Sequence, residues 1–227
     1  MSAQQTLLLP LVTQKHYGSW VRHPQVEDAA ARCAFWLVQG GLLWLSSEEI
    51  AGKSHFLQAL AQEHPQLAVL DGNANSGSSV QQLKLWLQKC QSSAYWLLDL
   101  PAGPLPQVQA YAVFHLIERA KEMNRSLLIS WRCDEKDMQP PELSSRLLMM
   151  ERVDMAAPLS DKDLSLVLQS VLLTMQWDMK ETVLPSLLQH IPRKLSALLG
   201  AIEKLDEYSR QNNVKMNAAL AVRILSA

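Results

Sequence analysis

The residues with the clearest chemical meaning form a short run, Gly52-Lys53-Ser54, at the end of the segment SSEEIAGKS. They match the second half of the phosphate-binding P-loop pattern G-x-x-x-x-G-K-[ST]. In such a loop, backbone N–H groups at a helix start face the phosphates, the lysine reaches the outer phosphates, and the hydroxyl helps to hold Mg²⁺. Ser47 stands where the pattern has its first glycine, so the loop departs from the pattern at its start.

Three further residues of this loop work against phosphate binding. Ile50 is β-branched and disfavours a positive φ, and Glu48 and Glu49 place two negative charges near the expected phosphates. We therefore expect ADP or ATP with Mg²⁺ to bind weakly or not at all. The helix start at Gly52 to Ser54 is nevertheless expected to be intact. A chance tripeptide is the alternative, and the predicted strand before the loop and helix after it argue against it.

A carboxylate that could complete the site ends a later apolar run. Asp99 lies in AYWLLDL, where a Walker B acid would join Ser54 in holding Mg²⁺. Leu100 and Pro101 follow it, so no second acid is present there to polarise water. We expect hydrolysis by this chain to be absent or very slow. The six histidines show no metal-ligand spacing, and no other metal site is predicted.

Strand-like and helical segments alternate through the part of the chain that would position these residues. Short apolar runs predict buried strands, and apolar residues at helical spacing predict helices. The predicted strands are 41–46, 67–72, 94–100, 126–133 and one within 151–159. The predicted helices are 23–40, 54–65, 80–90, 104–126 and 142–150. This alternation predicts an α/β fold, a parallel five-stranded sheet flanked by helices on both faces.

No strand pattern returns after Ser160, which is a predicted helix N-cap. Helical patterns then follow to the end of the chain. We expect a tail at 1–22, an α/β domain at 23–158 and a small all-α domain at 159–227.

Composition narrows the classes of protein further. The chain has 227 residues, of which 48% are hydrophobic and 19% charged, as in globular proteins. A net charge of −1 gives no long-range attraction to DNA or to an anionic membrane. The N-terminus lacks a basic region before its apolar run, and no segment has the length of a membrane span. We expect a cytoplasmic protein with reduced cysteines and with tryptophans in its core.

The order of these motifs resembles the DnaA family of AAA+ P-loop proteins, and within it the short Hda-type regulators of the initiator DnaA. The resemblance covers nearly the whole chain. The segments that carry it are an LxLP tail, GLLWL before AGKSHFLQAL, YWLLD, SLLIS, ELSSRL, APLSDKDL and PRKLSALLGAIEKLD. It implies an AAA+ domain with a helical lid, in which the loop and the carboxylate described above are the Walker A and Walker B elements.

The resemblance implies roles for three more residues. Ser130, at the end of the fourth predicted strand, matches the sensor 1 position. Arg146 in SSRL matches the arginine finger, which acts on nucleotide bound by a neighbouring subunit. Arg193 in PRKL matches sensor 2. Each has a structural alternative. Ser130 could be an ordinary serine at a strand end, Arg146 a solvated arginine on an amphipathic helix, and Arg193 an arginine at a helix start without a ligand.

The tail resembles the peptide with which Hda-type proteins bind the sliding clamp. The apolar anchors would be Leu7, Leu9, Pro10 and Leu11, and Thr6 stands where the pattern has glutamine. An extended peptide with such anchors suits a groove on a partner. The alternative is a tail that packs on its own domain.

The function implied is regulation of replication initiation. The chain would act with the sliding clamp and promote ATP hydrolysis on DnaA through Arg146. DnaA and the clamp are then its partners, a homodimer is left open, and no sequence-specific DNA binding or membrane contact is expected. The alternatives are a decayed AAA+ interaction scaffold that binds no nucleotide, and a slow AAA+ ATPase.

Overall fold

One parallel sheet of five strands organises the N-terminal part of the chain. The computed structural model describes residues 20–73, 76–175, 177 and 182–226. The strands are β1 (Leu42–Ser46), β2 (Leu67–Asp71), β3 (Tyr95–Asp99), β4 (Ser126–Ser130) and β5 (Glu151–Asp154). They lie in the order β2-β3-β4-β1-β5, and every neighbouring pair is parallel. The predicted parallel sheet is confirmed.

The fourth strand is shorter than predicted. It ends at Ser130 and does not extend to residue 133, because its register partner in β3 is Asp99, the last residue of that strand. The carboxyl ends of β3 and β4 therefore meet at one edge of the sheet.

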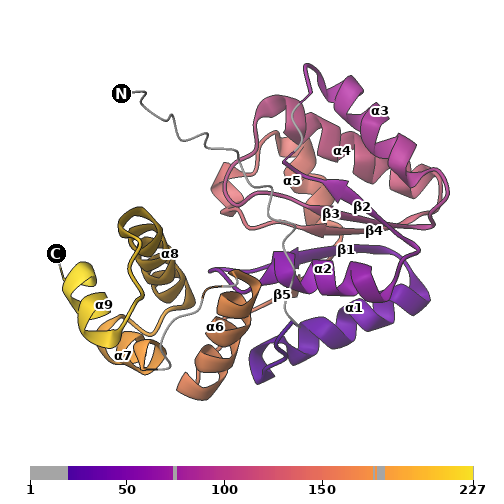
Figure 1. The fold of residues 1–227 in the computed structure, drawn as a ribbon. Coiled ribbons are helices and arrows are strands. Elements are labelled where there is room, and N and C mark those ends of the chain that lie inside the picture. Colours follow the sequence, from indigo (N-terminus) through magenta and orange to yellow (C-terminus); the bar gives the residue numbers. More distant parts are fainter. Residues whose placement is uncertain (1–19, 74–75, 176, 178–181, 227) are drawn as a thin grey trace, which may run out of the picture.

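Five helices cover the two faces of the sheet (Figure 1). They are α1 (Glu27–Gln39), α2 (Lys53–Glu63), α3 (Ser79–Cys90), α4 (Gln107–Glu122) and α5 (Pro141–Leu148). Along β1, Leu43 and Leu45 pack in the cluster with α1 and α2, whereas Trp44 packs in the cluster with α3, α4 and α5. Both faces are buried at the centre of the sheet, which explains why β1, β3 and β4 appear in the sequence as continuous apolar runs, whereas the edge strand β5 is mostly charged and exposed.

The predicted placement of the tryptophans in the core is confirmed for most of them. The side chains that are buried are Trp36, Trp44, Trp86, Trp96 and Trp131. Trp177 is only half-buried, and it packs against the hydrophobic cluster of the C-terminal helices.

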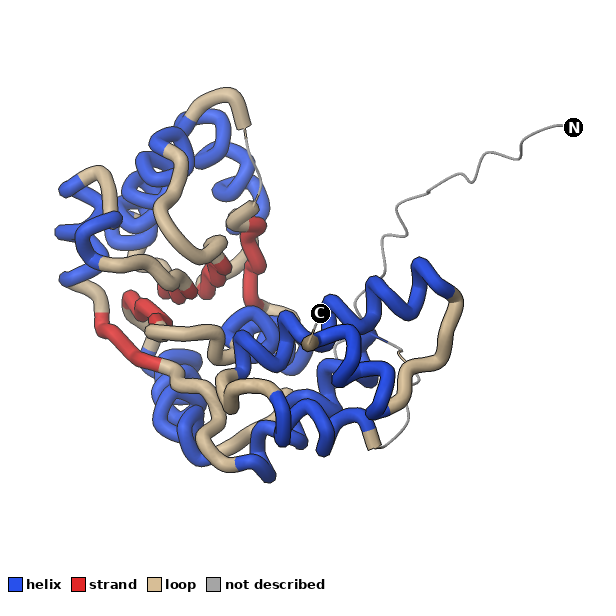
Figure 2. The backbone as a smooth tube through the Cα atoms, turned by 90° about the vertical axis from the view of Figure 1, so that its left-hand side faces the viewer, coloured by secondary structure: helices blue, strands red, loops and turns tan. Residues whose placement is uncertain are grey.

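In the described residues that follow the sheet, all regular elements are helices. They are α6 (Asp161–Met175), α7 (Val183–His190), α8 (Leu195–Asn212) and α9 (Ala218–Leu225). Figure 2 shows them gathered to one side of the strands, and they share a hydrophobic cluster of their own. Ser160 caps α6 as predicted, since its Oγ accepts a hydrogen bond of 3.1 Å from the backbone N–H of Asp163. None of the helices in the described residues has the length and apolar character needed to cross a membrane.

Candidate functional site

The loop predicted to bind phosphate connects β1 to α2, as expected. Gly52 is the N-cap of α2 and has a left-handed backbone, with φ 77° and ψ 20°. Glycine adopts this conformation without the strain that a Cβ would cause, so the pattern's second glycine is required here. Ile50 does not have a positive φ; among the described residues other than glycine, only Asn124 and Asn213 do. The backbone strain expected at Ile50 is therefore not what distinguishes this loop.

Lys53 is held by the residue that replaces the first glycine. Its Nζ donates a hydrogen bond to Oγ of Ser47, whose side chain is buried. Burial and the positive charge of Arg132 lower the pKa of Lys53 to about 8, although the carboxylates of Asp99 and Asp154 oppose that shift. The lysine that would reach a phosphate is thus already engaged within its own loop.

A polar cleft of about 270 Å³ lies over the loop and the ends of β3 and β4. Its walls bring together five residues predicted from the sequence, namely Gly52, Lys53, Ser54, Asp99 and Ser130. The hydroxyl of Ser54 and the carboxylate of Asp99 are oxygen ligands of the kind that Mg²⁺ prefers. Within the described residues no cluster of three or more His, Cys, Asp or Glu side chains could hold a metal ion, so a Mg²⁺ ion here would depend on the phosphates and on these two residues.

Ser130 has an unusual environment in this cleft. Its side chain is 0% exposed, and its Oγ has no hydrogen-bond partner among the described residues. Buried hydroxyl groups are normally paired, because an unpaired one costs about 1–3 kcal/mol. The fit to a ligand with oxygen atoms is therefore good at this position.

A second cavity of about 430 Å³ adjoins the cleft and is lined mainly by apolar side chains. The two share Ile50, Ala51, Gly52 and His55, and the rest of the larger cavity comes from the N-terminal segment at Trp20 and from α6 and α8. An apolar cavity joined to a polar cleft at a helix N-terminus can accommodate a flat base on one side and phosphates on the other.

The helical part reaches the loop through a residue that sequence reasoning missed. Lys194 Nζ lies 3.0 Å from Oε1 of Glu49. Arg193, the predicted sensor 2 residue, instead forms an ion pair of 3.3 Å with Asp161 and lines neither cavity. The signal in the sequence was the pair of basic residues before α8, but only the fold shows which of the two faces the loop.

Arg132 is the other residue that sequence reasoning missed. It lines the cleft beside Lys53, two positions after the predicted sensor residue Ser130. Alternation along an extended segment places residues i and i+2 on the same side, so its position after Ser130 was an available signal.

Arg146 lies on α5 and lines neither cavity. Its Nε is 2.6 Å from Oε1 of Glu118 on α4, and its guanidinium lies 5.7 Å from the centroid of the Phe114 ring. About a third of the side chain is exposed (32%). The adjacent Leu147 is buried, but Leu148 and Met149, which follow it, are exposed. Arg146 is thus placed on the surface and away from the chain's own cleft.

The predicted clamp-binding residues Leu7, Leu9, Pro10 and Leu11 lie outside the described residues.

The sheet order, the loop before α2 and the helices after the sheet give this chain an α/β fold of the P-loop kind followed by a helical part, a fold that it shares with the solved structures below. Among solved structures, the chain is similar to domain III of the replication initiation protein DnaA from Thermotoga maritima, with 16% identity and a TM-score of 0.63 over 91% of this chain and 93% of that one. It is also similar to AMPPCP-bound DnaA from Aquifex aeolicus, with 14% identity and a TM-score of 0.58 over 85% of this chain and 65% of that one.

The RuvB Holliday junction branch migration motor of Thermotoga maritima is similar at 10% identity, with a TM-score of 0.55 over 88% of this chain and 66% of that one. No sequence-family model and no curated protein matches the chain. At these identities the likeness defines the fold, and the function follows from the chain's own residues.

Proposed function

We propose that this chain is a DnaA-type regulator of replication initiation of the Hda kind, which presents Arg146 to ATP bound by DnaA. The observation that carries the proposal is the position of Arg146, which is partly exposed on α5 and lines neither cavity of its own chain. An arginine in this position can serve the nucleotide of a neighbouring protein.

The energetics of Arg146 allow such a role. Its ion pair with Glu118 is one-third exposed on both sides, and pairs of this kind contribute about 0–1 kcal/mol. Releasing the guanidinium toward a partner's phosphates therefore costs little. An arginine finger supplied in trans raises the rate of hydrolysis by about 10³–10⁵. The exposed side chains of Leu148 and Met149 supply apolar surface for the partner beside it.

The chain's own cleft supports a regulator better than an ATPase. Lys53 is bonded to Ser47, and Leu100 and Pro101 occupy the positions after Asp99 that would have to supply a water-polarising acid. Hydrolysis would then occur on DnaA, and this chain would act as the activating partner.

ATP hydrolysis by DnaA in the presence of clamp-loaded DNA tests this proposal. Wild-type protein is expected to stimulate hydrolysis, and Arg146→Ala is expected to abolish the stimulation. Arg119→Ala is the matched control, because Arg119 is an exposed arginine of α4 that pairs with Glu122. Absence of stimulation by the wild type, or full stimulation by Arg146→Ala, would refute the mechanism.

The clamp interaction is a separate part of the proposal and rests on the tail motif. A double substitution of Leu9 and Leu11 by alanine is expected to remove binding to the purified clamp in a pull-down. Undiminished binding by this variant would show that the tail is not the clamp-binding segment, whatever the outcome for Arg146.

The hydrogen bond between Lys53 and Ser47 also favours a second candidate, an AAA+ scaffold that binds partners without nucleotide. Calorimetric titrations with ADP and ATP separate the two, since two flat titrations together with a lack of DnaA stimulation would support the scaffold. A slow ATPase would instead show turnover that Lys53→Ala abolishes.

A further inference from the structure

We propose that Arg132 is a phosphate-binding residue of this chain, and that with Ser130 it binds the phosphate chain of a nucleoside diphosphate or of pyrophosphate in the polar cleft. The proposal goes beyond the regulatory function, which depends on Arg146, and concerns the chain's own ligand. Arg132 would supply the contact that Lys53 makes in a loop matching the full P-loop pattern.

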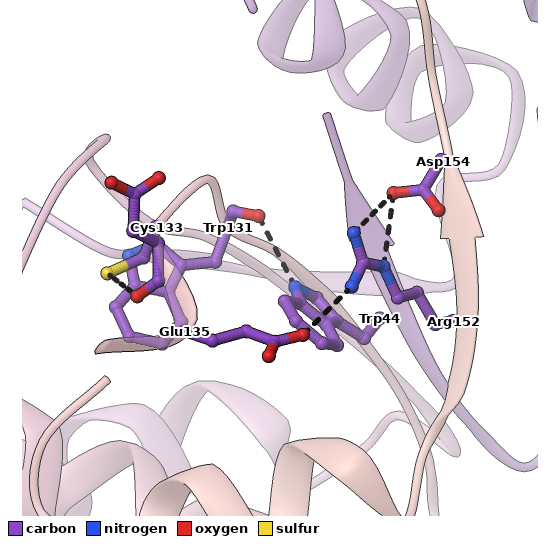
Figure 3. Close-up of polar contacts among 7 residues, drawn as sticks. Trp44, Trp131, Cys133, Glu135, Arg152 and Asp154 are labelled. Atoms are coloured by element: carbon purple, nitrogen blue, oxygen red, sulfur yellow. Dashed lines mark hydrogen bonds and ion pairs between the residues drawn. The ribbon is translucent and has the colours of Figure 1, made fainter. Parts of the chain in front are cut away.

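The backbone around Arg132 is firmly held beside the cleft. The backbone N–H of Gly103 donates to the carbonyl oxygen of Arg132 at 2.8 Å. The neighbouring Trp131 is fully buried, and its indole Nε1 donates to the carbonyl oxygen of Gly103 at 3.0 Å. The carbonyl oxygen of Trp131 in turn accepts a 3.3 Å hydrogen bond from Trp44 Nε1, as Figure 3 shows. Arg132 is therefore attached to a rigid point of the sheet edge.

Two carboxylates in this region, those of Glu135 and Asp154, are paired with another arginine. Figure 3 shows Arg152 between two carboxylates, with distances of 3.7 Å to Glu135 and 3.1 Å to Asp154. The Arg152 guanidinium also lies 4.9 Å from the centroid of the Trp44 ring. Both carboxylates form their ion pairs with Arg152, and no ion pair of Arg132 is found within the described part of the chain.

Two cationic side chains line the cleft close to each other. The cleft's four charged Lys, Arg, Asp and Glu side chains are Glu49, Lys53, Asp99 and Arg132, and Glu49 is paired with Lys194. Two cations therefore face one unpaired carboxylate. The charge of Arg132 also helps to lower the pKa of Lys53, which places the two cations close together. An anion between them would relieve this repulsion.

Ser130 supplies an independent indication that the cleft takes a ligand with oxygen atoms. Ser130 lines the cleft, and its Oγ is buried and has no hydrogen-bond partner among the described residues. A phosphate oxygen would accept its O–H, while the guanidinium of Arg132 can bind two phosphate oxygens at once. The guanidinium also brings positive charge without a metal ion, so the phosphate chain is expected to bind in the absence of Mg²⁺.

Calorimetric titration of the full chain with ADP, pyrophosphate and adenosine, each in EDTA, tests this inference. ADP and pyrophosphate are expected to bind to the wild type. Arg132→Ala is expected to lower the affinity for both by about tenfold or more, because a hydrogen bond to a charged group contributes about 1.5–3 kcal/mol. Binding of adenosine is expected to be the same in both proteins. Arg119→Ala is the matched control and is expected to bind like the wild type.

A second variant, Arg132→Gln, keeps the aliphatic part of the side chain in place if the alanine variant does not fold. Pyrophosphate that binds as tightly as ADP would identify the phosphate chain alone as the ligand, and tighter ADP would identify a nucleotide. Absence of binding of both to the wild type, or equal affinity in Arg132→Gln, would overturn the proposal. Neither result bears on stimulation of DnaA by Arg146, which is measured on the partner's nucleotide.

Discussion

Replacement of Ser47 by glycine should free Lys53 for a ligand phosphate and tighten the binding of ADP. In the wild type, Lys53 Nζ donates to Ser47 Oγ, so a phosphate has to compete with that bond. A hydrogen bond to a charged group contributes about 1.5–3 kcal/mol. Its removal should therefore raise the affinity for ADP by about 10- to 150-fold. The same loss should lower the free energy of unfolding of the ligand-free protein by about 1–3 kcal/mol.

The assay is a titration of ADP into wild type, Ser47→Gly and Ser47→Ala, with urea unfolding of each protein in parallel. The alanine variant lacks the hydroxyl but keeps the Cβ, so it separates release of Lys53 from the added backbone freedom of glycine. We expect it to recover most of the gain. If both variants unfold cooperatively and neither binds ADP more tightly than the wild type, the reasoning about Lys53 is wrong.

Three further predictions concern pH and stability. Because the pKa of Lys53 is lowered to about 8, its positive charge is lost as the pH rises through that value. ADP binding by the wild type should therefore weaken between about pH 7 and 9. Lys53→Arg should bind ADP with little change over this range, because arginine stays charged. A Cβ at Gly72 would lie 1.9 Å from the backbone oxygen of Asp99, so Gly72→Ala should lower the free energy of unfolding by about 1–3 kcal/mol. Gly77→Ala is the control, because the atom nearest to its Cβ would be 3.7 Å away. Equal stability of the two variants in urea unfolding would contradict this prediction. Leu116 is fully buried, and Leu116→Ala should cost about 2–5 kcal/mol in the same measurement; a loss below 1 kcal/mol would contradict the packing described here.

The sequence by itself determined the elements and their kind. Apolar runs predicted the first four strands, the fifth lies within the segment 151–159 where a strand was expected, and helical spacing predicted the helices between them. These predictions work because backbone sterics and side-chain periodicity act over a few residues. The helix start at Gly52 followed for the same reason, since the left-handed turn before α2 depends on the residue at that position alone. The sheet was predictable as parallel from the alternation of elements, but the order of its strands was not.

The tertiary structure decided which side chains meet, because these contacts join residues that the sequence pattern does not link. Arg146 pairs with Glu118 on another helix, and Lys194, which neighbours the predicted Arg193, reaches Glu49 in the loop. Arg132 lines the cleft because β4 ends at Ser130, where its neighbour β3 also ends. Such contacts depend on how whole strands and helices pack, and their free energies are set by burial and neighbouring charges that exist only in the folded chain.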